Sequence, residues 1–274
     1  MNSTFRLLLV LVVMFSVSCR SGGSDGDSGS GSDGGDTSLS RNTCGLVGLG
    51  TRIITGTECT ETNSPIVQVD LGFSDGRSGV CSGTMIASQW VLTAAHCFFE
   101  NPSSVFVSAG GVSVQGISAI VHPDVRVDEQ NQAVFNDLAL IKLANPVSLP
   151  TIAIVASKAP ISGDLIDIYG YGLSEDQSSS NNTVGTLRSG QMQVSQVSAY
   201  FVDAFYNGEG SNTCSGDSGG PALLSVGAQV ALVGVTSSGS LVNCEKGDTS
   251  RFTNVQQSNN LSFITKYVPN VKVL

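Results

Sequence analysis

Short stretches in which apolar and polar residues alternate run through most of the chain from residue 66 onward. Alternation with a period of two is typical of strands that bury one face, and the glycine-rich breaks between the stretches indicate turns. Many short strands separated by turns favour an all-β barrel or sandwich. The stretches that predict strands are residues 66–71, 105–107, 112–114, 164–171, 188–197, 221–224, 230–236 and 250–255. Near the C-terminus, Leu261, Ile264 and Val268 recur at helical spacing, which predicts one short terminal helix.

The N-terminal region follows a different pattern. Arg6 precedes an apolar run at residues 7–15, which is too short to span a bilayer comfortably, and small residues follow it. This arrangement predicts a secretory signal peptide over residues 1–18. Beyond it, the chain up to residue 40 consists almost entirely of Ser, Gly, Asp and Thr. Such a segment buries too little apolar surface to offset its ordering entropy, so we expect residues 19–40 to form a disordered, acidic spacer.

Cys19 stands at the end of the signal peptide, directly before the polar spacer. A small residue, a cysteine and a polar spacer together resemble a bacterial lipoprotein signal, in which the cysteine is acylated and attaches the protein to a membrane. Ser16 departs from that pattern, which favours an apolar residue at this place. The alternative is ordinary cleavage near Cys19, which would release a soluble protein. We favour acylation.

Residues 41–274 are enough for one domain, or for two fused half-domains, with a substantial core. The formal net charge of the whole chain is −9, and part of it lies in the spacer. An acidic exported protein is a poor candidate for binding nucleic acid or anionic lipid through charge. We therefore interpret the charge as favouring solubility.

The string GDSGG at residues 216–220 is the strongest candidate for chemistry. Glycines leave little bulk beside Ser218, and they permit backbone conformations that turn neighbouring N–H groups toward one point. A serine hydroxyl is a poor nucleophile unless a base and an orienting acid act on it. His96, in the string TAAHC, and Asp137, in the string NDLAL, are the candidates for these two roles.

The order His, Asp, Ser is the order of the triad in chymotrypsin-type serine proteases. All three strings, and their spacing, resemble the trypsin/chymotrypsin family. The resemblance covers residue 52 to the end, and it implies two packed six-stranded antiparallel β-barrels and a short C-terminal helix. The strings at residues 79–86 and 90–93 resemble the strands that precede the histidine in the family. The implied ranges are 53–150 for the first barrel, 151–256 for the second and 258–268 for the helix.

The resemblance also implies a mechanism. Ser218 attacks the scissile carbonyl, His96 transfers its proton to the leaving amine, and Asp137 orients the imidazole. The backbone N–H groups of Gly216 and Ser218 then form the oxyanion hole.

The substrate pocket implied by the resemblance has an amide at its base. The residue six before the nucleophile is Asn212, where trypsin-like enzymes carry Asp. Without a carboxylate, a basic substrate side chain would be buried as an unpaired cation, so we expect a neutral residue at P1. Asp248 would reverse this expectation if its long loop brings it into the pocket. The other expected pocket residues are Thr213, Ser237, Gly239 and Ser250.

Arg52 and Ile53 resemble the activation junction of the family, with residues 41–52 as the propeptide. Cleavage after Arg52 would free the amine of Ile53 to pair with Asp217, and a buried aspartate needs such a partner. If the pocket rejects arginine, another protease has to activate the zymogen.

Seven cysteines in an exported chain indicate disulfides with one cysteine left over, for which Cys19 is the natural candidate. The resemblance implies one disulfide beside His96 and one that braces the pocket: Cys81–Cys97 and Cys214–Cys244. Cys44 and Cys59 lack their usual partners and are close in sequence, so we expect them to pair. That bond would keep the propeptide attached after activation.

Together these observations predict an exported, monomeric serine endopeptidase of the cell envelope or exterior, which is made as a zymogen and acts on proteins or peptides. They imply no metal or organic cofactor. The main alternative is a catalytically silent homologue that serves as a binding or adhesion module; such proteins usually lose a triad residue, whereas this chain keeps all three. A serine esterase is disfavoured because the Gly-x-Ser-x-Gly pattern of residues 216–220 is not expected to form an elbow between a strand and a helix.

Overall fold

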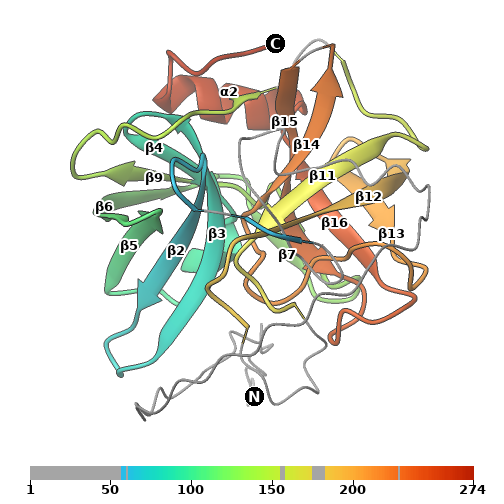
Figure 1. Cartoon of the computed structure of the whole chain (residues 1–274), viewed down its shortest axis with the longest axis horizontal. Helices are drawn as coiled ribbons and strands as arrows, with labels where there is room; N and C mark the ends of the chain where they lie inside the picture. Colours follow the sequence, from blue (N-terminus) through green and yellow to red (C-terminus); the bar gives the residue numbers. More distant parts are fainter. Residues whose placement is uncertain (1–56, 60, 155–157, 175–182, 228) are drawn as a thin grey trace, which may run out of the picture.

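The computed structural model describes residues 57–59, 61–154, 158–174, 183–227 and 229–274. Two groups of strands lie side by side, and helix α2 (Ser258–Tyr267) lies at one end of them (Figure 1). Within the described ranges, no helix is long and apolar enough to cross a membrane. The predicted signal peptide, spacer and propeptide lie outside these ranges, so their assignments stay predictions.

The first group of strands is a closed antiparallel barrel with the order β2-β3-β4-β9-β6-β5. Its strands are β2 (Ile66–Gly72), β3 (Ser78–Ala87), β4 (Trp90–Thr93), β5 (Ser104–Ala109), β6 (Val112–Val121) and β9 (Ala139–Leu143). Alternation along β2 buries Val67 and Val69 completely, and Met85, Leu92 and Leu140 join them from β3, β4 and β9. The packed interior holds β4 in place, and His96 follows shortly after this strand.

The second group follows the order β12-β11-β14-β15-β16-β13, and β13 pairs again with β12 and closes the circle. Its strands are β11 (Leu165–Gly170), β12 (Arg188–Val197), β13 (Phe201–Phe205), β14 (Pro221–Val226), β15 (Gln229–Gly239) and β16 (Thr249–Asn254). The predicted fold of two six-stranded antiparallel barrels with a C-terminal helix is therefore confirmed.

Four short strands lie outside the two circles. β1 (Thr57–Glu58) pairs with β12 of the second barrel, although it falls in the range 53–150 expected for the first. β10 (Ala153–Ile154) pairs in parallel with β15. β7 (Arg126–Asp128) and β8 (Ala133–Phe135) form a separate hairpin between β6 and β9.

Helix α2 is held against the first barrel through His122, which is almost fully buried at the end of β6. The imidazole lies 4.7 Å from the ring of Phe263, measured between centroids. Its Nδ1 accepts a hydrogen bond from the Asp124 N–H, and the Asn259 side chain donates to the Asp124 carboxylate. This packing indicates a structural role for His122.

Burial lowers the pKa of His122 below its ordinary value. As pH falls below about 6.5, the unfolded chain takes up the proton before the folded protein does, so the free energy of unfolding decreases. The contribution of His122 to the free energy of unfolding is complete above about pH 6.5, and it is lost as the pH falls through the lower pKa of the folded protein. We expect His122→Gln to abolish this part of the pH dependence, measured by urea unfolding between pH 7.5 and 4.5. An identical slope in wild type and variant would contradict the prediction.

Candidate active site

A cleft of about 430 Å³ lies between the two barrels. The first half of the chain contributes His96 and residues of the β7–β8 hairpin, namely Val127, Asp128, Gln132, Ala133 and Val134. The second barrel contributes Ser218 and the segments before and after it, including Thr213, Ser215, Ser237, Gly239, Leu241, Val242 and Asp248. Arg251 of β16 joins the second barrel to the β7–β8 hairpin, because it donates to the Asn131 carbonyl at 2.9 Å. The fold thus brings His96 and Ser218 to one cavity.

Asp137 holds the imidazole of His96 in one orientation. His96 lies in the short helix η1 (Ala95–Phe98) after β4, and Asp137 lies between β8 and β9. One carboxylate oxygen of Asp137 accepts the backbone N–H of His96 at 2.9 Å, and the other lies 2.7 Å from Nδ1. Because Asp137 is completely buried, Nδ1 is expected to carry the hydrogen and donate it. The Nε2 atom is then the nitrogen that is left to act as a base.

Ser237 gives Asp137 a further hydrogen bond, at 2.6 Å from its hydroxyl to Oδ2. It comes from β15, where the pairing with β16 shifts between Thr236 and Ser238. Ser237 is the extra residue of this β-bulge, and bulges re-aim side chains near active sites. A local irregularity of the second barrel thereby orients a carboxylate of the first.

The charge of Asp137 changes the basicity of His96. Burial alone lowers the pKa of this imidazole, but the Asp137 charge and hydrogen bond outweigh it and raise the pKa above its ordinary value. Only the neutral imidazole accepts a proton, so kcat/KM should be high above this pKa and fall as pH decreases through it. We expect the acidic limb of the profile to have a midpoint above about 6.5, measured with a peptide substrate at constant ionic strength. A midpoint below that value would contradict the inferred role of Asp137.

The loop that carries Ser218 is tightly bonded to both barrels. The Ser218 carbonyl accepts the Ser82 N–H at 2.7 Å, and the Gly219 N–H donates to Thr236 at 2.8 Å. Gly216 has a φ of 98°, and a Cβ there would lie 2.8 Å from the Cα of Gly172. Only glycine fits this turn, which lies two residues before the serine.

Asp217 is buried directly before Ser218. Its two oxygens accept backbone N–H groups from Gly172 at 2.9 Å and from Cys214 at 2.8 Å. Burial raises the pKa of Asp217 to about 6, although these hydrogen bonds and the charge of Arg188 act in the opposite direction. Its expected partner Ile53, and Arg52 before it, lie outside the described residues.

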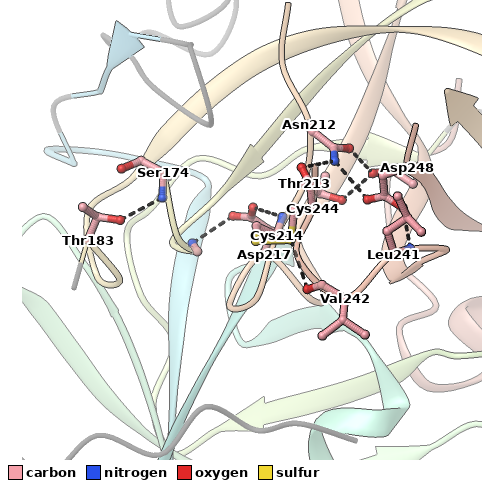
Figure 2. Close-up of a disulfide and its surroundings, with 12 residues drawn as sticks. Ser174, Thr183, Asn212, Thr213, Cys214, Asp217, Leu241, Val242, Cys244 and Asp248 are labelled. Atoms are coloured by element: carbon pink, nitrogen blue, oxygen red, sulfur yellow. Dashed lines mark hydrogen bonds between the residues drawn. A yellow bond between two sulfur atoms is a disulfide. The ribbon is translucent and has the colours of Figure 1, made fainter. Parts of the chain in front are cut away.

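The residues expected in the pocket lie in the wall of the cleft near Cys214 or directly behind it. Thr213, Ser237 and Gly239 line the cleft, whereas Asn212 and Ser250 are completely buried behind its surface. The Asn212 amide donates to Asp248 at 3.0 Å and accepts the Ser250 hydroxyl at 2.7 Å. Figure 2 shows Asn212 and Asp248 beside each other near the disulfide. Asn212 thus binds two residues of this region, and its place at the base of the pocket stays a prediction.

Asp248 is the carboxylate that lines this part of the cleft. One of its oxygens accepts the N–H groups of Ser240 at 2.7 Å and Leu241 at 2.9 Å. A Cβ on Gly239 would lie 2.9 Å from the other oxygen, so glycine makes room for the carboxylate in the wall. The four-bond network keeps Asp248 in place through its bonds to Asn212, Leu241 and the N–H and hydroxyl of Ser240.

Comparison with known proteins decides the family. Residues 53–261 match the model of the trypsin family. The chain belongs to the trypsin family. Brachyurin from Leptuca pugilator is 32% identical over 196 residues, which are 64% of this chain and 82% of that protein. The solved structure of HL collagenase has the same fold, with a TM-score of 0.62 and 24% identity over 76% of this chain and 96% of that one.

As a member of the trypsin family, the protein is a serine endopeptidase, a hydrolase whose substrates are proteins or peptides. Two disulfides implied by the family resemblance are present, Cys81–Cys97 and Cys214–Cys244. Disulfides fit an extracellular protein, and homologues in this family are typically secreted. Within the described part of the chain, no group of His, Cys, Asp and Glu side chains could hold a metal ion.

Some predicted residues cannot be compared with the structure. Cys59 is buried, but Cys44 and Cys19 lie outside the described ranges, so the Cys44–Cys59 bond and the acylation of Cys19 stay predictions. Other cleft residues were missed altogether. Val127, Leu241 and Val242 line the cleft with substantial exposure, and no motif in the sequence marks them.

Proposed function

We propose that this trypsin-family protein cleaves peptide bonds through a triad of His96, Asp137 and Ser218. The observation that carries the proposal is the buried Asp137 carboxylate, which binds both the backbone N–H and Nδ1 of His96 within a cleft that Ser218 also lines. This arrangement leaves Nε2 as the only ring nitrogen for proton transfer.

In the proposed reaction, Nε2 of His96 takes the hydroxyl proton of Ser218 while the oxygen attacks the substrate carbonyl. The N–H groups of Gly216 and Ser218 stabilise the oxyanion of the tetrahedral intermediate. His96 then protonates the leaving amine, and the C–N bond breaks to give an acyl-enzyme. Water attacks the acyl carbon while His96 takes its proton. His96 then returns this proton to Oγ of Ser218 as the ester C–O bond breaks, and the acid product leaves.

The proposed zymogen switch involves the same loop. Cleavage after Arg52 would release the α-amino group of Ile53, which is mostly cationic at neutral pH. The buried Asp217, with its pKa near 6, is an anion that such a cation would stabilise. The proposed precursor consists of a signal peptide (1–18), a spacer (19–40), a propeptide (41–52) and the protease domain (53–274). We expect the activated protein to be a monomer.

Acylation of Cys19 is tested by phase separation in Triton X-114. Protein that is acylated at Cys19 should enter the detergent phase, and the Cys19→Ser variant should stay in the aqueous phase.

The position of Asp248 changes the proposed substrate preference. A neutral P1 residue was expected because the pocket lacked a carboxylate, and Asp248 supplies one in the lining of the cleft. We therefore infer that the pocket accepts Lys or Arg at P1, because a cation there gains a buried counter-charge. The same pocket would accept Arg52, so the protein could activate itself without another protease.

Fluorophosphonate labelling tests the triad and the switch together. Ser218 should react only in molecules that have been cleaved after Arg52, whether by limited trypsin treatment or by the protein itself, and Ser218→Ala should react in neither state. Absence of labelling in both states, with folded protein confirmed, would refute the catalytic proposal and favour a binding module. N-terminal sequencing of wild type and Ser218→Ala, each expressed alone, shows whether cleavage at Arg52 depends on the protein's own activity.

A further inference from the structure

A buried hydroxyl from the first barrel lies against the loop that carries the nucleophile. Ser82, in β3, has no exposed surface. Its Oγ donates to the carbonyl of Gly216 at 2.9 Å and accepts the N–H of Tyr171 at 2.9 Å. Its backbone N–H donates to the carbonyl of Ser218 at 2.7 Å. One residue of the first barrel thus bonds to two residues of the loop and to the strand end of the second barrel.

Ser82 holds the peptide that follows Gly216, which is next to the peptide that carries the Gly216 N–H. The peptide between Gly216 and Asp217 is held on both sides, by Ser82 at its carbonyl and by the Cys214 carbonyl at the Asp217 N–H, at 3.0 Å. Because the peptide is planar, these two bonds fix its orientation. The Gly216 N–H is connected to this fixed peptide plane through the two backbone rotations at Gly216. Because glycine has no side chain to restrict these rotations, the hydrogen bonds around the residue set the direction of the N–H.

The neighbouring segment strengthens this arrangement. Three consecutive residues after β11 each bond toward the nucleophile loop: Tyr171 through the Ser82 hydroxyl, Gly172 directly to Asp217, and Leu173 to the Ser215 carbonyl at 2.9 Å. The Ser82 hydroxyl is the only side-chain link among the three that comes from the other barrel. Without it, the Tyr171 N–H and the Gly216 carbonyl would both lose a buried partner.

We propose that Ser82 is a positioning residue. By holding the carbonyl of Gly216, it keeps the N–H of the same residue in place to stabilise the oxyanion. The proposal rests on the function proposed above, because it concerns the donor that the reaction uses. Ser82 does not touch substrate; it acts through Gly216. Losing one oxyanion donor outright costs about 10²- to 10³-fold in kcat, so loosening one should cost less.

Ser82→Ala is the test, with Ser64→Ala as a matched control. Ser64 is also completely buried, just before β2 of the first barrel, and its hydroxyl donates to and accepts from the backbone of Ile66. We expect Ser82→Ala to lower kcat about tenfold with little change in KM, and to weaken a peptide aldehyde inhibitor by the same factor. Ser64→Ala should change neither value, although both variants lose stability.

Active-site titration with a fluorophosphonate counts the folded, competent molecules, so partial misfolding does not imitate a loss of kcat. Ser82→Gly leaves room for a water between the same two groups and should recover most of the lost kcat. Wild-type kcat and aldehyde affinity in Ser82→Ala would overturn the proposal, and so would equal losses in Ser64→Ala. A wild-type protein that neither hydrolyses peptides nor reacts with fluorophosphonate would instead refute the proposed function itself.

Discussion

Asp137→Asn is expected to lower kcat by about 10⁴-fold, which is the size of the effect for the same change in a related triad. The amide keeps the shape of the carboxylate, but its NH₂ cannot accept the hydrogen of Nδ1. If the NH₂ faces His96, the ring takes the other tautomer, with the hydrogen on Nε2, and can no longer receive the proton of Ser218. The hydroxyl of Ser237 also loses an ionised acceptor.

A matched control for this change is Asp167→Asn. Asp167 is as deeply buried, and it accepts a hydrogen bond from the Gln191 side chain at 2.8 Å within the second barrel. Its substitution should reduce the free energy of unfolding but leave kcat within a few-fold of wild type. Equal losses of kcat in both variants would show that Asp137 serves the fold and not the reaction. Steady-state kinetics above pH 8, corrected for titrated sites, make the comparison.

The proposed triad could be read from the sequence because each member lies in a short string whose local structure is self-contained. Ser218 lies among glycines that permit its turn, and His96 follows a strand that its own apolar residues predict. The strands that the sequence missed lack such signals. β13 (Phe201–Phe205) contains Asp203 and Ala204, which are residue types depleted in strands, and the β7–β8 hairpin has strands of only three residues each.

The pocket could not be derived in the same way, because its wall consists of residues that meet only after folding. The spacing from Ser218 points to Asn212, but the amide turns behind the surface to bind Asp248 and Ser250. Whether Asp248 enters the cleft depends on the path of the loop from Ser240, which no periodic pattern describes. The role of Ser82 was hidden for the same reason: its partners lie 134 and 89 residues away along the chain.

Asp248→Asn is expected to lower kcat/KM for substrates with Arg or Lys at P1 by roughly 10²- to 10³-fold, because the substrate cation would lose its buried counter-charge. Substrates with Leu or Met at P1 should change by only a few-fold. The ratio between the two classes is the informative quantity. The new NH₂ group would face the Asn212 amide and disturb the wall, and a ratio removes damage that affects both classes alike.

The control for this prediction is Asp128→Asn. Asp128 also lines the cleft, but it lies on the β7–β8 hairpin, is more exposed than Asp248 and already binds the Asn131 side chain. A charge exposed to water attracts a substrate cation far less than a buried one, so this variant should leave the ratio almost unchanged. Equal changes in both variants would mean that the overall negative potential of the cleft selects the substrate. If the wild-type protein instead prefers Leu or Met at P1 and shows no effect of Asp248→Asn, this result would restore the expectation of a neutral P1 residue. It would mean that the four hydrogen bonds around the Asp248 carboxylate are sufficient to cancel its attraction for a substrate cation.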